Sequence, residues 1–327
     1  MRVIITFDLE FSIAGAFSKI PNCQPIAEQI IEPEYRNRKI GFYDVLTILE
    51  SAQVKATFFT EVLNTFYFGF EKMQKFAQIL LEKEQDVQVH LHPCWSAFKK
   101  QNWKSVTQKT PPQDNVFHLS KGEIENYLYE AKEIFYKWGV PEPRAFRAGN
   151  LQANMDLYRA LKATGYEVSS NIGMGALIPD NEKLQIKTAY ANIEGITEYP
   201  VTSYKSTGKR NKILTVCGSS FSEMKNVIDK AYLSGVSHVI ILSHIHEFIK
   251  KKDFRYSKVK PNRVNLARLE KLCHYVNSSS HLGFSDFGFL PQITEYTEPQ
   301  EQDIHTRLLS GVSSILQNKI NDRLWAL

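Results

Sequence analysis

Short apolar runs alternate along the chain with longer segments in which apolar residues recur every three to four positions. The runs predict buried strands and the periodic segments predict amphipathic helices, and this alternation is typical of an α/β layer or barrel. The predicted strands span residues 2–8, 54–60, 86–92, 143–147, 166–171, 195–201, 213–217, 237–245 and, as a ninth candidate, 284–290. The predicted helices lie near residues 41–52, 69–85, 121–138, 154–164, 222–234 and 262–277.

Several predicted helices carry start and stop signals. Ser120 followed by Glu123 is a capping-box pattern, which satisfies free amide groups in the first turn of a helix. Gly139, Gly165 and Gly235 follow three predicted helices, and glycine readily adopts the left-handed conformation that ends a helix. These signals predict turns at the same boundaries as the periodicity.

Two long segments, residues 11–40 and 96–119, lack such periodicity, and each follows a predicted strand that ends in polar residues. Long loops in a compact domain often form binding walls or lids. After residue 290 an acidic stretch leads into one amphipathic helix. We therefore expect one large domain over residues 1–290. Residues 291–327 are expected to form a linker and a C-terminal helix that docks on this domain or on a second copy.

The composition limits the class of protein. With 43% hydrophobic and 23% charged residues, the 327-residue chain can bury a large core. The net charge of +5 is small and the basic residues are dispersed, so nucleic-acid binding is not expected, and the run from Lys250 to Lys252 is interpreted as a solvated face. No stretch reaches the roughly twenty apolar residues of a membrane span. Four cysteines without CxxC spacing, and no signal-peptide pattern, favour a cytoplasmic protein.

Three predicted strands end in polar residues spaced two apart, which places both side chains of a pair on one face of the strand. The pairs are Asp8/Glu10, His90/His92 and His244/His246. Active sites of α/β barrels and sheets form at the carboxyl ends of the strands. Converging carboxylates and imidazoles there predict a divalent-metal or acid–base site, with zinc as the first choice and cobalt, nickel or manganese as alternatives. The other interpretation is a structural network of ion pairs and hydrogen bonds.

Five short motifs contain or adjoin these residues. They are Thr-Phe-Asp-Leu-Glu (6–10), Lys-Ala-Thr-Phe-Phe (55–59), Val-His-Leu-His-Pro (89–93), Phe-Arg-Ala-Gly-Asn (146–150) and Ile-Leu-Ser-His (241–244). In this order they resemble the polysaccharide deacetylases, carbohydrate esterase family 4. The resemblance extends from residue 1 to about 290 and leaves out the C-terminal helix. It implies an α/β fold, a distorted (β/α) barrel of about seven strands.

The resemblance also implies roles for individual residues. Asp8 corresponds to the catalytic base and Glu10 to a metal-binding carboxylate, although the family has adjacent aspartates here and the two carboxylates could exchange roles. Arg147 corresponds to the arginine that orients the base, and His244 to the histidine that protonates the leaving amine.

The metal-binding histidines depart from the family pattern. His90 and His92 correspond to two metal ligands but lie two residues apart, whereas the family usually spaces them four apart. The sequence leaves open whether His92 or His246 completes the metal site.

The implied activity is hydrolysis of an N-acyl group, N-acetyl first, from an amino sugar of a polysaccharide or its precursor, in a branch that resembles enzymes of O-antigen-type surface polysaccharide synthesis. Candidate substrate-binding residues are Asn150, His246, Trp95 and Trp103, and the tryptophans stack on sugar rings or serve as local packing anchors. Two alternatives remain. One is an amidohydrolase or deformylase that acts on a small or lipid-linked amide, and the other is an inactive carbohydrate-binding protein on the same fold.

Overall fold

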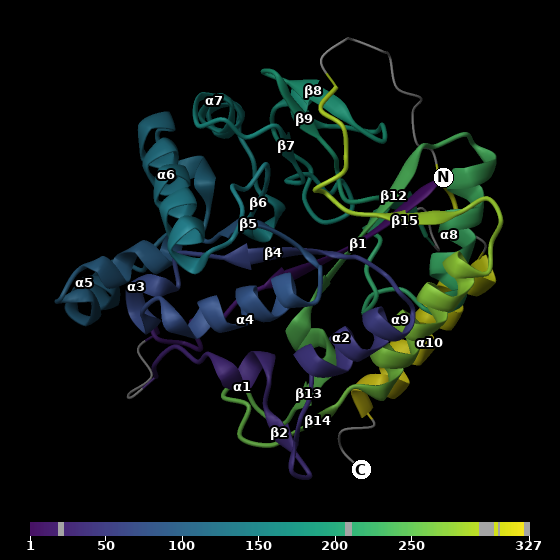
Figure 1. The fold of residues 1–327 in the computed structure, drawn as a ribbon, viewed down its shortest axis with the longest axis horizontal. Coiled ribbons are helices and arrows are strands. Elements are labelled where there is room, and N and C mark those ends of the chain that lie inside the picture. The colour runs from purple at the N-terminus through teal and green to yellow at the C-terminus, as the bar shows by residue number, and fades with distance from the viewer. Residues whose placement is uncertain (19–22, 207–210, 294–303, 307, 324–327) are drawn as a thin grey trace.

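The computed structural model describes residues 1–18, 23–206, 211–293, 304–306 and 308–323. Its centre is a curled sheet of nine strands among these residues, and its strands run in the order β12-β1-β4-β5-β6-β7-β9-β8, with β15 also beside β1 (Figure 1). Their bounds are β1 Arg2–Leu9, β4 Thr57–Glu61, β5 Asp86–Leu91, β6 Ala145–Ala148, β7 Val168–Ser169, β8 Ala191–Ile193, β9 Ile196–Glu198, β12 His238–His244 and β15 Gly283–Ser285. All neighbours pair in parallel except β8 with β9.

Irregular backbone joins the two ends of the curled sheet. The amide of Thr202 donates to the carbonyl of Ile240 in β12 at 3.1 Å, and the amide of Leu242 donates to the carbonyl of Leu214 at 3.0 Å. The structure is therefore a distorted barrel in which one wall is held by single hydrogen bonds in place of a regular strand. The predicted strand at 213–217 is wrong in this respect, because β11 covers only Asn211–Ile213 and Thr215 forms an isolated bridge to Leu242.

Strand β1 shows how the alternation of side chains builds both the core and the barrel interior. Val3, Ile5, Phe7 and Leu9 belong to the main hydrophobic cluster, which also contains the buried faces of the helices. Ile4, on the opposite face, packs in a smaller cluster with residues of other strands inside the barrel. The inward positions that follow along the strand are polar, so the floor of the barrel is apolar and its carboxyl-terminal end is polar.

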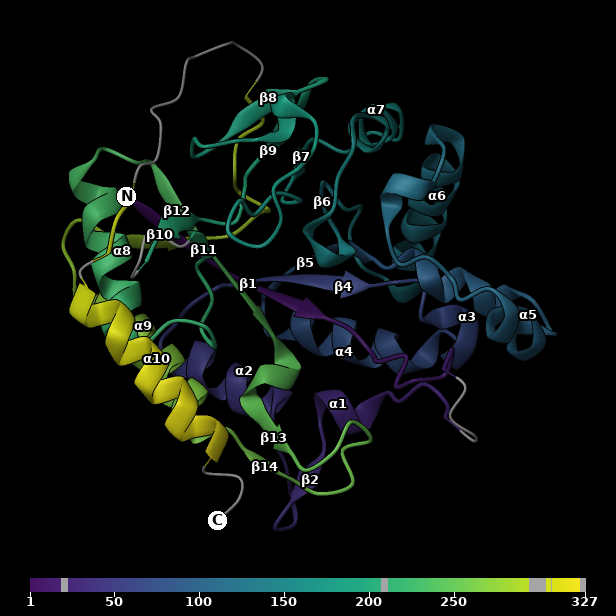
Figure 2. The same cartoon turned by 180° about the vertical axis from the view of Figure 1, so that it is seen from behind.

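Helices cover the outside of the sheet (Figures 1 and 2). The longer ones are α2 Phe42–Ser51, α4 Glu71–Glu82, α6 Lys121–Trp138, α7 Met155–Ala163, α8 Phe221–Leu233 and α9 Arg263–Asn277. They confirm the six helices predicted from periodicity to within two or three residues. The Ser120/Glu123 capping box is present, and Gly139 adopts the left-handed conformation at the end of α6.

The two long segments without periodicity contain short elements. These are α1 Glu28–Ile31, β2 Glu34–Tyr35 and β3 Arg38–Lys39 in the first, and η1 Pro93–Lys99, α5 Trp103–Lys109 and η2 Val116–His118 in and around the second. The remaining elements are α3 Thr65–Phe68, η3 Gly149–Leu151, η4 Glu182–Leu184, β10 Ser203–Lys205, η6 Ile245–Phe248, β13 Ile249–Lys251 and β14 Val259–Pro261. No helix among the described residues is long and apolar enough to cross a membrane.

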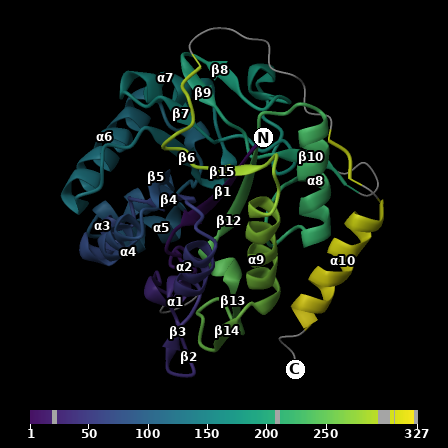
Figure 3. The same ribbon diagram turned by 45° about the vertical axis from the view of Figure 1, so that its right-hand side comes forward.

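The C-terminal helix α10 (Leu308–Arg323) lies alongside α8 on the outside of the barrel (Figure 3). It packs through small and polar residues, because Ser314 and Asn321 are buried whereas Ile315, Leu316 and Ile320 are 49%, 55% and 58% exposed. The Ser314 hydroxyl accepts a hydrogen bond from the Ser220 amide at 2.7 Å and donates to Glu223. A C-terminal helix is thus present, and the side chains by which it contacts the barrel are small and polar. The acidic stretch from 294 to 303 lies outside the described residues.

Candidate metal and acid–base site

The register of the parallel strands brings the predicted site residues to one end of the barrel. Asp8 in β1 lies directly opposite His244 in β12, and His90 in β5 lies opposite Arg147 in β6. All four are at or next to the carboxyl end of their strands. This is the edge at which α/β barrels place their active sites.

Glu10, His90 and His92 form a group whose ligand atoms lie within 4.8 Å of one another. The Glu10 Oε2 atom is 2.9 Å from His92 Nε2 and 3.6 Å from His90 Nε2. Tetrahedral zinc sites with bonds of about 2.0–2.1 Å place donor atoms about 3.3–3.4 Å apart. Two imidazole nitrogens and one carboxylate at these separations fit a divalent cation such as zinc.

The other ring nitrogen of each histidine has its own partner. Nδ1 of His90 lies 2.9 Å from the carbonyl oxygen of Arg147, and Nδ1 of His92 lies 2.7 Å from Asp114 Oδ2. Since both partners are acceptors, each Nδ1 carries the hydrogen and each Nε2 is left to bind a metal. Hydrogen bonds of this kind orient histidine ligands in metal sites.

Asp114 and Glu61 hold the His92 segment from two sides. Asn150 donates through Nδ2 to the backbone carbonyl and to Oδ2 of Asp114, at 3.1 and 3.2 Å. Glu61, fully buried on β4, accepts from the amide of His92 at 2.6 Å and from the amide of Leu63 at 2.7 Å. The structure thus places Asn150, a predicted substrate-binding residue, where it supports the partner of a candidate metal ligand.

Asp8 and Arg147 form a buried ion pair beside this group. Arg147 Nη1 donates to Asp8 Oδ1 at 2.7 Å and to Thr6 Oγ1 at 2.9 Å, and its other nitrogens donate to Ser170. The Arg147 side chain is fully buried and stacks over the ring of Phe59 at 4.1 Å. Asp8 Oδ2 is left facing His90 Nε2 at 3.9 Å and His244 Nε2 at 3.7 Å.

His244 lies between two carboxylates. Its Nε2 faces Asp8, and its Nδ1 is 3.1 Å from Glu247 Oε1. His246 follows on the 3-10 turn η6, and its ring lies 5.0 Å from that of His244, centroid to centroid. Because the strand ends at His244, the spacing of two does not carry His246 to the Glu10 group. The candidate metal group therefore contains His92 and not His246.

The charges in the site shift several protonation equilibria. Burial alone raises the pKa of Asp8 and of Glu10, but Arg147 with neighbouring histidines outweighs it for Asp8, and the histidines alone outweigh it for Glu10, so the pKa of each carboxyl is lowered. Burial alone lowers the pKa of His92, but Glu10 and Asp114 raise it well above its usual value. A proton on His92 thus holds the place between Glu10 and the ring that a cation would take, and metal binding must release it.

The two tryptophans proposed to stack on sugars belong to an aromatic cluster. Trp95 is 2% exposed and packs against Phe68 and Phe98. Trp103 is partly buried and meets Phe98 edge to face with ring centroids 4.7 Å apart. The sequence left stacking on a sugar and local packing open, and in this structure the ring of Trp95 is covered by its neighbours.

Three residues of the site, Asp114, Glu61 and Glu247, were not predicted from the sequence. Asp114 lies in the non-periodic segment 96–119, which was singled out only as a candidate wall. Glu61 is the first residue after the predicted strand 54–60, and Glu247 lies three residues after His244. Glu61 and Glu247 could have been found, because each is a carboxylate within three residues of a strand-end motif. No neighbouring motif marks Asp114.

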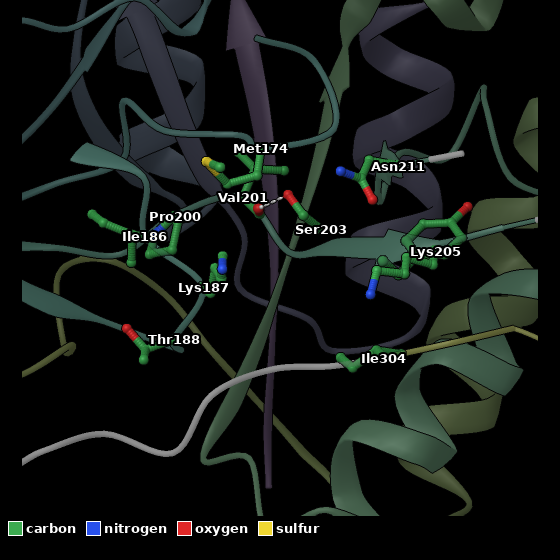
Figure 4. A pocket seen from close by; sticks show the side chains of 11 residues that line it. Met174, Ile186, Lys187, Thr188, Pro200, Val201, Ser203, Lys205, Asn211 and Ile304 are labelled. Atoms are coloured by element: carbon green, nitrogen blue, oxygen red, sulfur yellow. Dashed lines mark hydrogen bonds between the residues drawn. The ribbon is translucent and has the colours of Figure 1, made fainter. Parts of the chain in front are cut away.

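A separate pocket of about 240 Å³ lies between the segment that carries Lys187 and the β10–β11 hairpin (Figure 4). Its walls combine Lys187, Lys205 and Asn211 with apolar side chains that include Met174 and Val201. The residues that line it include none of the site residues predicted from the sequence. It adjoins the barrel end through Val201, which also packs against Leu151 and Leu242.

The sequence matches no protein-family model and no curated protein. The structure resembles a protein from Mycobacterium smegmatis with a provisional assignment as a polysaccharide deacetylase, with a TM-score of 0.55 and 13% identity over 91% of this chain and 94% of that chain. A family 4 carbohydrate esterase from Streptomyces lividans, in complex with acetate, gives 0.46 and 11% over 91% and 98%. The 4-alpha-glucanotransferase from Thermococcus litoralis gives 0.49 and 12% over 100% and 46%.

The fold is therefore the distorted (β/α) barrel of the polysaccharide deacetylases, with an added C-terminal helix, as the sequence motifs predicted. At such low identity the resemblance defines the fold alone. One fold hosts many activities, so the activity has to be argued from the side chains of the site.

Proposed function

We propose that this protein is a metal-dependent hydrolase that removes an acyl group from the amide nitrogen of an amino sugar. The observation that carries the proposal is the placement of the Glu10, His90 and His92 group beside the buried Asp8–Arg147 ion pair and His244, at the carboxyl end of a deacetylase-type barrel. These groups supply a metal site, a base and an acid within one polar end of the barrel.

Glu10 is the carboxylate best placed to bind the cation, since its Oε2 atom approaches both histidine Nε2 atoms more closely than Asp8 does. A bound zinc ion or similar cation supplies Lewis acidity, which polarises an amide carbonyl and lowers the pKa of water. The buried ring of His90 and the Asp114 contact of His92 hold the donor atoms in position before any cation arrives.

Asp8 is the group placed to accept a proton from the attacking water. Arg147 holds its Oδ1 atom, so Oδ2 is directed into the site between the two histidines. The low pKa of Asp8 keeps the carboxylate ionised at neutral pH, which a proton acceptor requires. Arg147 acts through Asp8 and is a positioning residue.

His244 is the group placed to protonate the departing amine. Burial lowers its pKa, but the hydrogen bond and charge of Glu247 raise it to about 9, so the ring carries a proton at neutral pH. Its Nε2 atom faces the same space as Asp8 Oδ2, 3.7 Å away. An amine is a poor leaving group unless it is protonated, and this arrangement supplies the proton.

The finer parts of the proposal rest on the sequence alone. They are an N-acetyl group, zinc as the cation, and a cytoplasmic precursor of a surface polysaccharide as the substrate. The amidohydrolase or deformylase alternative uses the same residues. Release of acetate or of formate from amino-sugar substrates distinguishes these activities.

The test compares metal content and acyl release in the wild type, Glu10→Ala, His90→Ala and Asp8→Asn, with His274→Ala on the exposed side of α9 as a control for loss of a histidine. In the proteins as purified, without added metal, we expect one ion bound tightly by the Glu10 group of the wild type, its loss in the first two variants, and a bound ion without turnover in Asp8→Asn. Loss of metal in Asp8→Asn would move Asp8 into the ligand set. Glycan binding without hydrolysis by the metal-loaded wild type would identify an inactive binding protein.

A further inference from the structure

We propose that His244, His246 and Glu247 form a second divalent-cation site, separate from the Glu10, His90 and His92 group. One ligand atom from each of the three residues lies within 4.8 Å of the others. The chemistry is two imidazoles and one carboxylate, a set that binds zinc in catalytic sites with an open coordination position.

The distances within this second group fit a cation. His244 Nδ1 and Glu247 Oε1 are 3.1 Å apart, close to the 3.3–3.4 Å or so between donor atoms of a tetrahedral zinc site. The rings of His244 and His246 are tilted by 35° with centroids 5.0 Å apart, so both can face one ion without stacking on each other.

Two of the donor groups have unused capacity. The Oε2 atom of Glu247 is shielded from solvent and accepts no hydrogen bond of standard geometry among the described residues, although the Cys217 thiol is close enough to help lower the pKa of this carboxyl. No hydrogen bond to the imidazole of His246 is found among those residues either, although its backbone carbonyl accepts one from the amide of Ile249. Buried polar atoms without partners are rare in folded proteins, and an ion is one of the few explanations for them.

The turn that carries the group is held rigidly from the adjacent helix. Asn262 and Asn265 donate through Nδ2 to the backbone carbonyl of Glu247 at 2.9 and 2.8 Å. The backbone of η6 is thereby fixed against α9, and the side chains of His246 and Glu247 project from a defined turn. A binding site on rigid backbone loses little entropy when it takes up its ligand.

The second group meets the first through Asp8 and His244. Asp8 Oδ2 is 3.9 Å from His90 Nε2 and 3.7 Å from His244 Nε2, so this carboxylate separates the two groups. A cation bound to Nδ1 of His244 would replace the proton on that nitrogen, and the neutral ring could then donate its Nε2 proton only by becoming an imidazolate. This consequence rests on the proposed function, and it makes occupancy of the second site inhibitory.

The experiment is a metal titration of the chelator-stripped full chain with cobalt(II) or zinc alone, with bound ions counted by mass spectrometry after dialysis. We expect two ions per wild-type chain at saturation, one in His246→Ala, one in Glu247→Gln, one in Glu10→Ala and none in Glu10→Ala/His246→Ala. The exposed-histidine control His274→Ala should bind two. Circular dichroism establishes that each variant is folded, and Glu247→Gln preserves the size of the side chain if His246→Ala is unstable.

The second site is refuted if folded His246→Ala and Glu247→Gln both bind as many ions as the wild type. That result is distinct from failure of the proposed function, which would appear as an unchanged ion count in Glu10→Ala. If acyl release is established, the ratio of activity at saturating metal to activity at one equivalent should be well below one in the wild type and close to one in His246→Ala. Equal ratios in the two proteins would remove the inhibitory role.

Discussion

Gly149 and His92 are in direct contact, and a Cβ atom added at Gly149 would lie 2.5 Å from both Cε1 and Nδ1 of the His92 ring. The ring therefore rests against bare backbone at the end of β6. Asp114, in the segment 96–119, accepts a hydrogen bond from Nδ1 of the same ring. Together the two contacts aim Nε2 at Glu10, so a glycine in the Phe-Arg-Ala-Gly-Asn motif acts on the candidate metal site from outside it.

Replacing Gly149 with alanine should weaken metal binding. The added methyl group cannot share space with the ring, so His92 must turn away from Glu10 or the strand end must shift. Changes that misplace a metal ligand in this way typically cost about 10- to 100-fold in metal affinity. Competition with a chelator of known affinity measures the change.

Gly122→Ala is the matched control, because a Cβ at Gly122 meets nothing within 4 Å. It should leave metal affinity unchanged. If Gly149→Ala binds metal as tightly as Gly122→Ala, the position of His92 does not depend on this contact.

Asp114→Ala should also weaken metal binding by roughly 10- to 100-fold, since it removes the acceptor that fixes the protonated nitrogen of His92. Asp114→Asn keeps an oxygen that can accept the same hydrogen bond but removes the charge, and it should fall between the wild type and Asp114→Ala. Isothermal titration with zinc at constant pH gives the affinities. Equal affinity in all three proteins would show that Asp114 neither orients nor charges the ligand.

The barrel and most of the site could be predicted because they follow from short-range patterns. Alternation along β1 places Asp8 on the inner face, and the parallel register then sets it opposite His244 without any knowledge of the loops. The same alternation places His90 beside Arg147. Residues at the ends of regular strands are thus fixed by the sheet, and a spacing of two along the sequence is enough to predict their direction.

The remaining features depend on where the chain leaves regular structure. His246 was considered as an alternative to His92 in the metal site, but β12 ends at His244, and the turn η6 keeps His246 beside His244 and outside the Glu10 group. Asp114 reaches His92 from 22 residues further along the chain, across a segment with no periodic signal. For Trp95 the sequence left stacking on a sugar and local packing open, and the loop folds it into an aromatic cluster.

In helix α10, a buried serine should contribute more to the free energy of unfolding than an apolar residue, although the apolar pattern of the sequence suggests the reverse. Ser314→Ala should lower the free energy of unfolding by about 1–3 kcal/mol, because it leaves the buried Ser220 amide without its acceptor and removes one of the donors to the buried Glu223. Ile315→Ala, at a position that is 49% exposed, should change it by less than about 0.5 kcal/mol. Urea unfolding of the two variants beside the wild type measures both. A larger loss in Ile315→Ala would mean that the apolar face of α10 is the one that packs.

The pH dependence of activity tests the partnership of His244 and Glu247. As an acid, His244 must be protonated, so its contribution is complete well below a pKa of about 9 and is lost as the pH rises through that value. Glu247→Gln removes the charge that raises this pKa, so the alkaline limb of the profile of kcat/KM should move down toward the ordinary histidine value of about 6.5. The acidic limb should stay in place, because Asp8 owes its low pKa to Arg147, His90 and His244, and His244 still carries a proton in the acidic range. Both proteins should be measured with one equivalent of metal, which is enough to fill the Glu10, His90 and His92 group. A difference between the profiles then does not arise from loss of that metal. An alkaline limb that does not move in Glu247→Gln would assign it to another group and leave His244 without a role as the acid.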